Sequence, residues 1–299
     1  MWHFVADLHL DHGNIIKYCN RPFLSDTEQG LVDMINKGLV PQRELRISQQ
    51  SINNMTDTIL DNINATVQKN DTLVIGGDFC WTNRENRDRR TKELRDRINC
   101  ENVYLIWGNH DDRRTLDYKD VQTFPDRTVT TVYENKKLFK GCYDQYMFKV
   151  DGEHIFMSHY PARSWDMAHH GSWMLYGHVH NLFWYEDNGQ LSPSTKNILG
   201  NDFAQVLKKH NIEDQSIIDD LLSVVADQHG GDLTVDVGVD NVRPGVPFGT
   251  PWSMDDLRAY MKQKKAKWDA RQVRIRAVRP LSQRKGAERN QLGEHLNEN

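Results

Sequence analysis

The stretch from Val103 to Asp112 reads Val-Tyr-Leu-Ile-Trp-Gly-Asn-His-Asp-Asp and changes character in its middle. Its first half is a short apolar run with β-branched and aromatic residues, which predicts a buried strand. The run ends at Gly108, and four polar residues follow, Asn109 to Asp112. Such a group fits either an exposed turn or a catalytic loop at the carboxyl edge of a sheet, where α/β proteins usually bind ligands. This stretch by itself leaves both alternatives open.

The same pattern, an apolar strand followed by aspartate or histidine, recurs four more times. The further polar groups follow strands expected at residues 1–6, 72–75, 154–157 and 173–176, and they are Asp7/His9, Asp78, His159 and His178/His180. In Asp-x-His and His-x-His, alternate side chains of an extended segment point to the same side. We therefore expect all five groups to lie at one edge of a sheet and to face a common centre.

The side chains of these five groups favour a metal centre. They offer carboxylate and amide oxygens and imidazole nitrogens, but no thiolate. This mixture suits Mn²⁺, Fe or Zn²⁺ better than a cysteine-rich structural zinc site. Together with His110 the set has eight members, which is more than one ion with open coordination positions needs. Two ions that share a bridging carboxylate need about this number.

The segments between these groups predict an α/β fold. A helix from residue 51 is indicated by an apolar stripe at spacings of three and four, formed by Ile52, Met55, Ile59, Ile63 and Val67. A strand at residues 72–75, a charged helix at 83–98 and the strand before Gly108 follow. The order strand, helix, strand, helix, strand argues for a sheet flanked by helices. Residues 25–50, with one short helix around 31–35, resemble an insertion.

Beyond Asp112 the predicted elements are shorter. Strands are expected at residues 128–133, 146–150 and 154–157, the last two joined at Asp151-Gly152, a tight-hairpin signal. Helices at about 202–210 and 214–228 lie in a second insertion, residues 181–231, and a late strand covers 233–237. A capping-box pattern beginning at Ser253 opens a last helix. We expect one domain over residues 1–260, then a basic helix and a polar, disordered tail at 261–299.

The composition is that of an ordinary globular chain, with 299 residues, 38% hydrophobic and 27% charged. No apolar run approaches the ~20 residues that a membrane helix needs, and no charged-then-apolar leader precedes Phe4. The four cysteines are widely scattered without a CxxC pair, which fits reduced thiols. We therefore expect a cytoplasmic protein that does not associate with membranes, whose oligomeric state the composition leaves open.

The net charge of −4 is unevenly spread. The segment from Lys262 to Arg289 holds eleven lysines and arginines against Asp269 and Glu288, so the rest of the chain is acidic, as suits a protein that collects carboxylates around cations. The basic segment fits a solvated helix that packs on the body through Trp268, or an electrostatic contact with nucleic acid. No nucleic-acid-binding motif accompanies it.

The five polar blocks, DxH, GD, GNH(D/E), H and GHxH in this order, resemble those of the calcineurin-like metallophosphoesterase superfamily. The resemblance runs from Asp7 to His180. The stretches from Asp11 to Ile16, Arg21 to Phe23 and Asp236 to Asp240 resemble those of its small bacterial and phage members. The resemblance implies a fold of two packed β-sheets flanked by helices.

The resemblance also implies which residue holds which ion. A first ion would be bound by Asp7, His9, Asp78 and His180, and a second by Asp78, Asn109, His159 and His178, with Asp78 bridging. The ions would be two divalent cations, with Mn²⁺ expected first and Fe, Zn²⁺, Ni²⁺ or Mg²⁺ also compatible. His110 would lie near the leaving group rather than bind metal.

This arrangement implies hydrolysis of a phosphoester. A hydroxide held between the two cations would attack phosphorus in line, and His110 would donate a proton to the departing oxygen. Many members carry an aspartate three residues after the bridging one, which orients this histidine, but here the position is Trp81. We expect Asp111 to take over that role; the alternatives are that Asp112 does so or that His110 works without an orienting partner.

The expected substrate is a small phosphomonoester or phosphodiester, such as a nucleotide or cyclic nucleotide. His12, Arg21 and Arg113 lie beside the ligand blocks and are candidates for phosphate contact, although a structural or solvated role is also open for each. One alternative is a nuclease or polynucleotide-end phosphatase that holds its strand with the basic segment. Another is a non-catalytic metal-binding scaffold, but such relatives lose ligands or the histidine, and all eight residues are present here.

Overall fold

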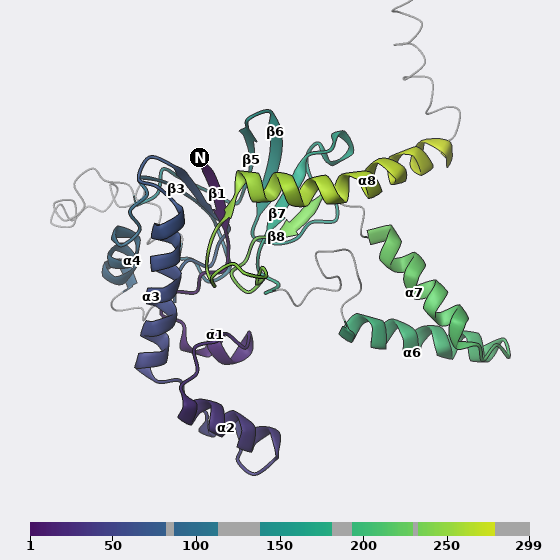
Figure 1. Cartoon of the computed structure of the whole chain (residues 1–299), viewed down its shortest axis with the longest axis horizontal. Helices are drawn as coiled ribbons and strands as arrows, with labels where there is room; N and C mark the ends of the chain where they lie inside the picture. Colours follow the sequence, from purple (N-terminus) through teal and green to yellow (C-terminus); the bar gives the residue numbers. More distant parts are fainter. Residues whose placement is uncertain (82–86, 113–137, 181–192, 230–232, 279–299) are drawn as a thin grey trace, which may run out of the picture.

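Two β-sheets pack face to face at the centre of the molecule, with helices outside them (Figure 1). The structure is a computed structural model, and it describes residues 1–81, 87–112, 138–180, 193–229 and 233–278. The first sheet has the order β4-β3-β2-β1-β9, and its strands are β1 (Trp2–Val5), β2 (Thr72–Ile75), β3 (Asn102–Ile106), β4 (Gly141–Tyr143) and β9 (Trp252–Ser253). The second has the order β5-β6-β7-β8, with β5 (Gln145–Val150), β6 (Glu153–Ser158), β7 (Trp173–Tyr176) and β8 (Thr234–Asp236). The expected α/β fold of two packed sheets flanked by helices is confirmed.

Strand direction brings the chemistry to one edge. Strands β1 to β4 are parallel, and β9 runs antiparallel to β1. In the second sheet β6, β7 and β8 are parallel, and β5 pairs antiparallel with β6 through the Asp151-Gly152 turn. The two sheets join where β1 and β8 end, because the Ala6 N–H donates to Val237 O at 3.0 Å and the Val239 N–H donates to Ala6 O at 3.1 Å. The carboxyl ends of both sheets therefore meet.

The core between the sheets is built from alternate residues of facing strands. Phe4 of β1 meets Phe148 of β5 edge to face, with ring centroids 6.3 Å apart. Ile106, Val74, Met157 and Leu175 add buried aliphatic side chains to the same cluster. Because this layer fixes the separation of the sheets, it also fixes where the strand ends stand relative to one another.

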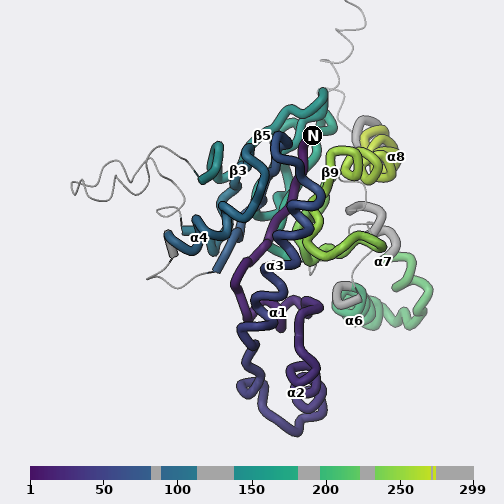
Figure 2. The backbone as a smooth tube through the Cα atoms, turned by 60° about the vertical axis from the view of Figure 1, so that its left-hand side comes forward, coloured from purple at the N-terminus to yellow at the C-terminus, as the bar shows by residue number. Residues whose placement is uncertain are grey.

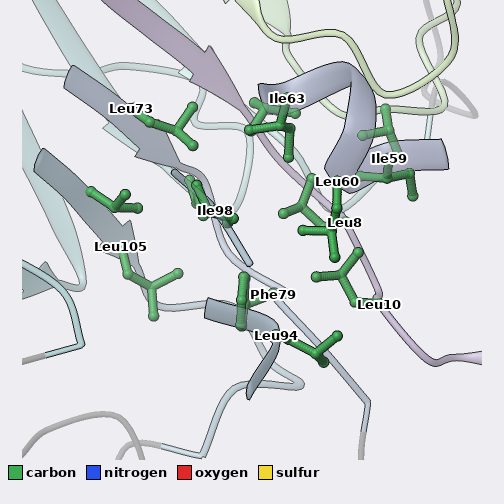
Figure 3. Close-up of a cluster of buried hydrophobic side chains, with 14 of the residues drawn as sticks. Leu8, Leu10, Ile59, Leu60, Ile63, Leu73, Phe79, Leu94, Ile98 and Leu105 are labelled. Atoms are coloured by element: carbon green, nitrogen blue, oxygen red, sulfur yellow. The ribbon is translucent and has the colours of Figure 1, made fainter. Parts of the chain in front are cut away.

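A second core lies between the first sheet and the helix α3 (Gln49–Thr66), which crosses its outer face (Figures 2 and 3). Met55, Ile59, Ile63 and Val67 are buried, as the apolar stripe predicts. The helix begins two residues before the expected start, because the Ser48 side chain caps it by accepting from the Ser51 N–H.

The segment expected as an insertion, residues 25–50, contains more helix than predicted. The helix α2 (Asp26–Asn36) starts at a capping box between Ser25 and Glu28, a Ser-x-x-Glu signal that is readable in the sequence. The Glu28 carboxylate also accepts hydrogen bonds from the Ser48 N–H at 2.6 Å and the Ser51 hydroxyl at 2.6 Å. One buried carboxylate therefore fastens α2 to the start of α3.

The remaining helices surround this body. They are α1 (Gly13–Tyr18), α4 (Arg87–Asp96), α6 (Pro193–Lys209), α7 (Gln215–His229) and α8 (Met254–Val278), with short 3₁₀ turns at Gln42–Glu44 and Ala168–His170. Helices α6 and α7 contact each other and stand away from the sheets (Figure 1). The expected capping box at the start of α8 is present, since the Asp256 N–H donates to the Ser253 hydroxyl and the Ser253 N–H donates to the Asp256 carboxylate.

Helix α8 carries the first part of the basic segment. Trp268 packs against the core between the sheets, as one of the two interpretations expected, and Lys264 donates to Thr234 O at 2.6 Å. The strand expected at residues 128–133 and the tail beyond residue 278 lie outside the described residues. Within the described ranges, none of the helices has the length and apolar character needed to cross a membrane.

The Glu28 anchor makes a pH-dependent contribution to stability. Burial alone would raise the pKa of Glu28, but its hydroxyl and N–H donors outweigh burial and lower it from 4.5 to about 2. Because the folded-state pKa is the lower one, the stabilisation is complete above the unfolded value and disappears as the pH falls towards 2. We expect Glu28→Gln to lower the free energy of unfolding by about 1–3 kcal/mol at pH 7, and by less at pH 3.

Urea unfolding at both pH values measures this difference. The control is Glu44→Gln, an exposed side chain of the same segment that pairs loosely with Arg43 at 3.7 Å. A difference for Glu28→Gln that stays constant with pH would contradict the assigned role.

Candidate metal centre

Five of the seven expected ligands have positive φ and lie in the loops that follow the strands. Six residues with positive φ lie in or beside the predicted ligand set, and they are Asp7 (56°), His9 (48°), Asp11 (62°), Asp78 (54°), His178 (71°) and His180 (49°). Non-glycine residues rarely adopt this conformation, and it costs of order 1–3 kcal/mol when the structure imposes it. Asp7, His9 and His180 nevertheless come together in one cluster, whereas Asp11 pairs with Arg90.

Asp7 lies at the centre of this convergence. Its two carboxylate oxygens accept from the His178 N–H at 2.9 and 2.8 Å. One ligand atom each of Asp7, His9 and His180 lie within 4.8 Å of one another, and the same holds for Asp7, Asp78 and His159. The two groups share Asp7, so the structure brings ligands of both expected ions into one cluster.

Asp78 lies between the histidines that are expected to bind different ions. Its Oδ2 is 3.3 Å from His9 Nε2 and 3.5 Å from His159 Nε2, while its Oδ1 accepts from the His110 N–H at 2.9 Å. This position supports the expected bridging role. The division of the ligands between two ions stays a prediction.

The ligands expected for the second ion also come together. Asn109 Oδ1 lies 2.9 Å from His159 Nε2 and 3.0 Å from His178 Nδ1. His159 Nδ1 donates to Gly76 O at 2.9 Å, because a carbonyl can only accept. This contact leaves the Nε2 lone pair directed at the centre, the arrangement that a metal-binding histidine requires.

The donor set fits divalent cations. His9 Nε2 is buried and makes no hydrogen bond of good geometry, although Asp78 Oδ2 lies 3.3 Å away, so a metal ion could bind between the two. Burial lowers the pKa of His9 to about 4, and burial also lowers the pKa of His159 and His178, which favours the neutral imidazoles that metals bind. Burial and the nearby Asp236 raise the pKa of Asp7, a penalty that a bound cation would remove.

Glycines of the motifs allow the backbone to approach these carboxylates. A Cβ on Gly108 would lie 2.2 Å from Asp78 Oδ1, and one on Gly177 would lie 2.6 Å from Asp7 Oδ2. Neither distance is possible for a carbon atom in contact with an oxygen. The glycines of the GNH and GHxH blocks are therefore required by space at the site.

A family comparison agrees with this geometry. The model of the calcineurin-like phosphoesterases matches residues 3–182, which is more than half of the chain and includes every expected ligand. The protein belongs to this family. Members typically bind two divalent metal ions, and the described residues contain the ligand clusters for them.

Two similar proteins are themselves uncharacterised or of unknown function. An uncharacterised protein of Methanocaldococcus jannaschii, MJ1445, is 29% identical over 109 residues, which are 36% of this chain and 46% of the relative. A protein of unknown function from Aquifex aeolicus, AQ665, has a solved structure that aligns with 80% of this chain and 90% of its own. The two structures align with a TM-score of 0.39 at 16% identity.

Aromatic rings pack around His110. The indole of Trp81 meets it edge to face at a centroid distance of 4.9 Å, and the His9 ring lies 5.2 Å away. The His12 ring stacks on the Trp81 indole, with a centroid distance of 4.6 Å and an interplanar angle of 13°. Trp81, at the sequence position where many members carry an aspartate, therefore packs beside the histidine.

Asp111 has a different role from the one expected. Its carboxylate accepts from the backbone N–H groups of Gly108 at 2.8 Å, Asp78 at 2.9 Å and Phe79 at 2.9 Å. The expectation that it orients His110 is thus replaced by a link between the two loops that follow β2 and β3. The sequence could not show this, because the three donors belong to the main chain.

The three residues considered for phosphate contact, Arg21, His12 and Arg113, differ in where they lie. Arg21 is buried, and its guanidinium donates to Asp240 and to the carbonyl oxygens of Asp7 and Leu8, so it does not fit the expected phosphate contact. His12 is mostly buried under Trp81, and burial lowers its pKa to about 3. Arg113 lies outside the described residues. Asp240 was not expected at the site, although it too follows an apolar strand, as the other polar groups do.

The link formed by Asp111 predicts a loss of stability. In Asp111→Asn an amide NH₂ replaces one acceptor, so at least one buried N–H loses its partner, at a cost of about 1–3 kcal/mol. We expect this decrease in the free energy of unfolding of the metal-free protein, measured in urea, and weaker Mn²⁺ binding because Asp78 and Asn109 lose their common anchor. Asp61→Asn, an exposed change on α3, is the control, and equal behaviour of the two variants would contradict the link.

Proposed function

We propose that this protein hydrolyses a small phosphomonoester or phosphodiester, such as a nucleotide or cyclic nucleotide, with two divalent cations, Mn²⁺ first among them. The observation that supports this is the convergence of Asp7, Asp78, Asn109 and four histidines on one point at the carboxyl edge of both sheets. In two-metal sites the cations are typically about 3.5–4 Å apart. Such a pair would neutralise phosphate oxygens and make a bound water acidic enough to react near neutral pH.

The chain itself contributes rigid ligands and a proton donor. Backbone N–H groups of His110 and His178 hold the carboxylates of Asp78 and Asp7 in place in the absence of an ion. His110 stands beside His9 and is less buried than that ligand, so it can reach a leaving group. Donation of a proton from its imidazole to the departing oxygen contributes ~10²–10⁴-fold.

Trp81 supports a small substrate with a flat leaving group. Its indole is 45% exposed, next to His110, while His12 covers one face. An exposed indole at that position offers stacking to a nucleobase or another planar group. A nucleoside leaving group would gain from this surface, whereas a phosphorylated serine would not.

The first prediction of this function concerns the bridging carboxylate and the proton donor. We expect the wild type to hydrolyse bis-p-nitrophenyl phosphate or p-nitrophenyl phosphate with Mn²⁺, and to lose turnover on chelation. Asp78→Ala should bind less Mn²⁺ and lose activity, because both sites lose a ligand. His110→Gln should keep its Mn²⁺ and lose ~10²–10⁴-fold in kcat, because only the proton donor is removed.

The ratio of diester to monoester turnover distinguishes a phosphodiesterase from a phosphomonoesterase. The nucleotides to assay next are 2′,3′-cyclic and linear ones. Tyr18→Ala, a change on the exposed face of α1, is the surface control. Folded wild type that binds two Mn²⁺ and turns over no phosphoester would favour the non-catalytic scaffold. Salt-sensitive DNA or RNA binding that depends on Lys262 to Arg289 would favour the nuclease.

The second prediction concerns the aromatic contact on His110. Trp81→Ala removes the ring beside the imidazole, and a displacement of about 1 Å in a catalytic group can cost ~10²-fold. We expect kcat to fall ~10–100-fold in Trp81→Ala with unchanged Mn²⁺ content, and to recover in part in Trp81→Phe. Unchanged kcat in Trp81→Ala would show that the ring does not position His110.

A further inference from the structure

Asp240 lies outside the segment that matches the family, yet it contacts an expected metal ligand. It follows β8, in the loop beyond the Ala6–Gly238 bridge that joins the sheets. Its side chain is 3% exposed, and its Oδ2 accepts from His180 Nδ1 at 2.7 Å. Because a carboxylate only accepts, this contact requires the proton of the imidazole to be on Nδ1. The lone pair is then on Nε2, the nitrogen that is free for a cation.

Arg21 binds the same carboxylate from the opposite side. Its Nε and Nη2 donate to the two oxygens of Asp240, both at 2.8 Å, in the two-pronged geometry that fixes a carboxylate most firmly. The guanidinium also donates to Asp7 O at 2.7 Å and Leu8 O at 2.9 Å. These carbonyls belong to the loop in which Asp7 and His9 are held in left-handed turns.

Net stabilisation of the fold is a weak explanation for this pair. The Arg21 side chain is 0% exposed, and taking two charges out of water costs about as much as their attraction returns. The pair instead connects residues that are 219 positions apart in the sequence. Each of them also contacts a residue expected to bind the first ion: Arg21 contacts Asp7, and Asp240 contacts His180. Direct metal binding by Asp240, in a group with Cys19 and His180, is disfavoured because both of its oxygens already accept from Arg21.

We propose that Arg21 and Asp240 are positioning residues of the first metal site: Asp240 fixes the tautomer and direction of His180, and Arg21 holds Asp240 together with the Asp7–Leu8 backbone. This inference rests on the proposed function, since it needs a cation among Asp7, His9 and His180. The pair thereby fixes the relative positions of three ligands, Asp7, His9 and His180, that come from distant parts of the sequence. Outer contacts of this kind typically change metal affinity ~10–100-fold.

The chain offers matched controls for both residues. Asp71 accepts from His3 Nε2 at 3.2 Å, a carboxylate–histidine pair remote from the expected ligands, so Asp71→Asn controls for Asp240→Asn. Arg95 is a buried arginine that donates to the carbonyls of Leu138, Ile98 and Cys100, so Arg95→Lys controls for Arg21→Lys. Both controls disturb comparable buried contacts without touching a ligand.

The experiment titrates metal-free protein with Mn²⁺ and follows the free ion by electron paramagnetic resonance. We expect Asp240→Asn and Arg21→Lys to weaken one of two sites ~10–100-fold and to leave the other within about twofold. Their urea midpoints should shift no more than those of Asp71→Asn and Arg95→Lys. Equal affinity to wild type at both sites, or an equal loss at both in proportion to stability, would overturn the proposal.

A second readout does not depend on metal or turnover. Nitrogen-15 spectra of the histidine rings in the metal-free wild type should show the proton of His180 on Nδ1, and Asp240→Ala should shift His180 towards the Nε2–H form. A wild-type His180 with its proton on Nε2 would overturn the tautomer role, whatever the affinities. Wild type that binds no Mn²⁺ at all would instead remove the proposed function, so the two failures are distinguishable.

Discussion

Two buried carboxylates, Asp7 and Asp78, stand close together where the two sheets meet, and the surrounding structure compensates for this unfavourable arrangement. Burial penalises both charges. The N–H groups of His178 and His110 reach them from neighbouring loops, and glycines at 108 and 177 leave room for that approach. Burial would raise the pKa of Asp78, but contacts with His9, His159 and the His110 N–H outweigh it and hold the pKa at about 2. The site is thus preorganised for cations before any cation is bound.

The left-handed turns show that this preorganisation costs backbone strain, which the rest of the fold must offset. Each places a non-glycine residue at positive φ in a loop that follows a strand, and the strands are held by the two packed cores on either side of the first sheet. Strain of this kind persists only where the surroundings determine the conformation. The bridge between Ala6 and Gly238 determines the conformation of the loop after β1. The contacts of Asp111 determine the loops after β2 and β3. The site is therefore a property of the sheet junction rather than of any one motif.

Around the ligands, this chain departs from the family pattern in a consistent way. Where other members place an aspartate beside the catalytic histidine, Trp81 and His12 form a stacked pair against His110. The acidic residues that remain nearby face other partners: Asp111 holds main-chain N–H groups, and Asp240 holds Arg21 and His180. Within the described residues, the His110 ring contacts the rings of His9, His12 and Trp81. This packing also leaves a partly exposed indole beside His110.

The sequence by itself determined the ligand types, their order and their places after strands, because each block is local and the period of a strand dictates which side chains share a face. It also determined helix α3 and the hairpin at Asp151-Gly152. Only the tertiary structure decided the roles of Asp111, Arg21 and Asp240. Their partners are main-chain groups or residues up to 219 positions away, and no local pattern encodes such contacts. A carboxylate in a sequence shows that a charge is available, but packing decides which donor it meets.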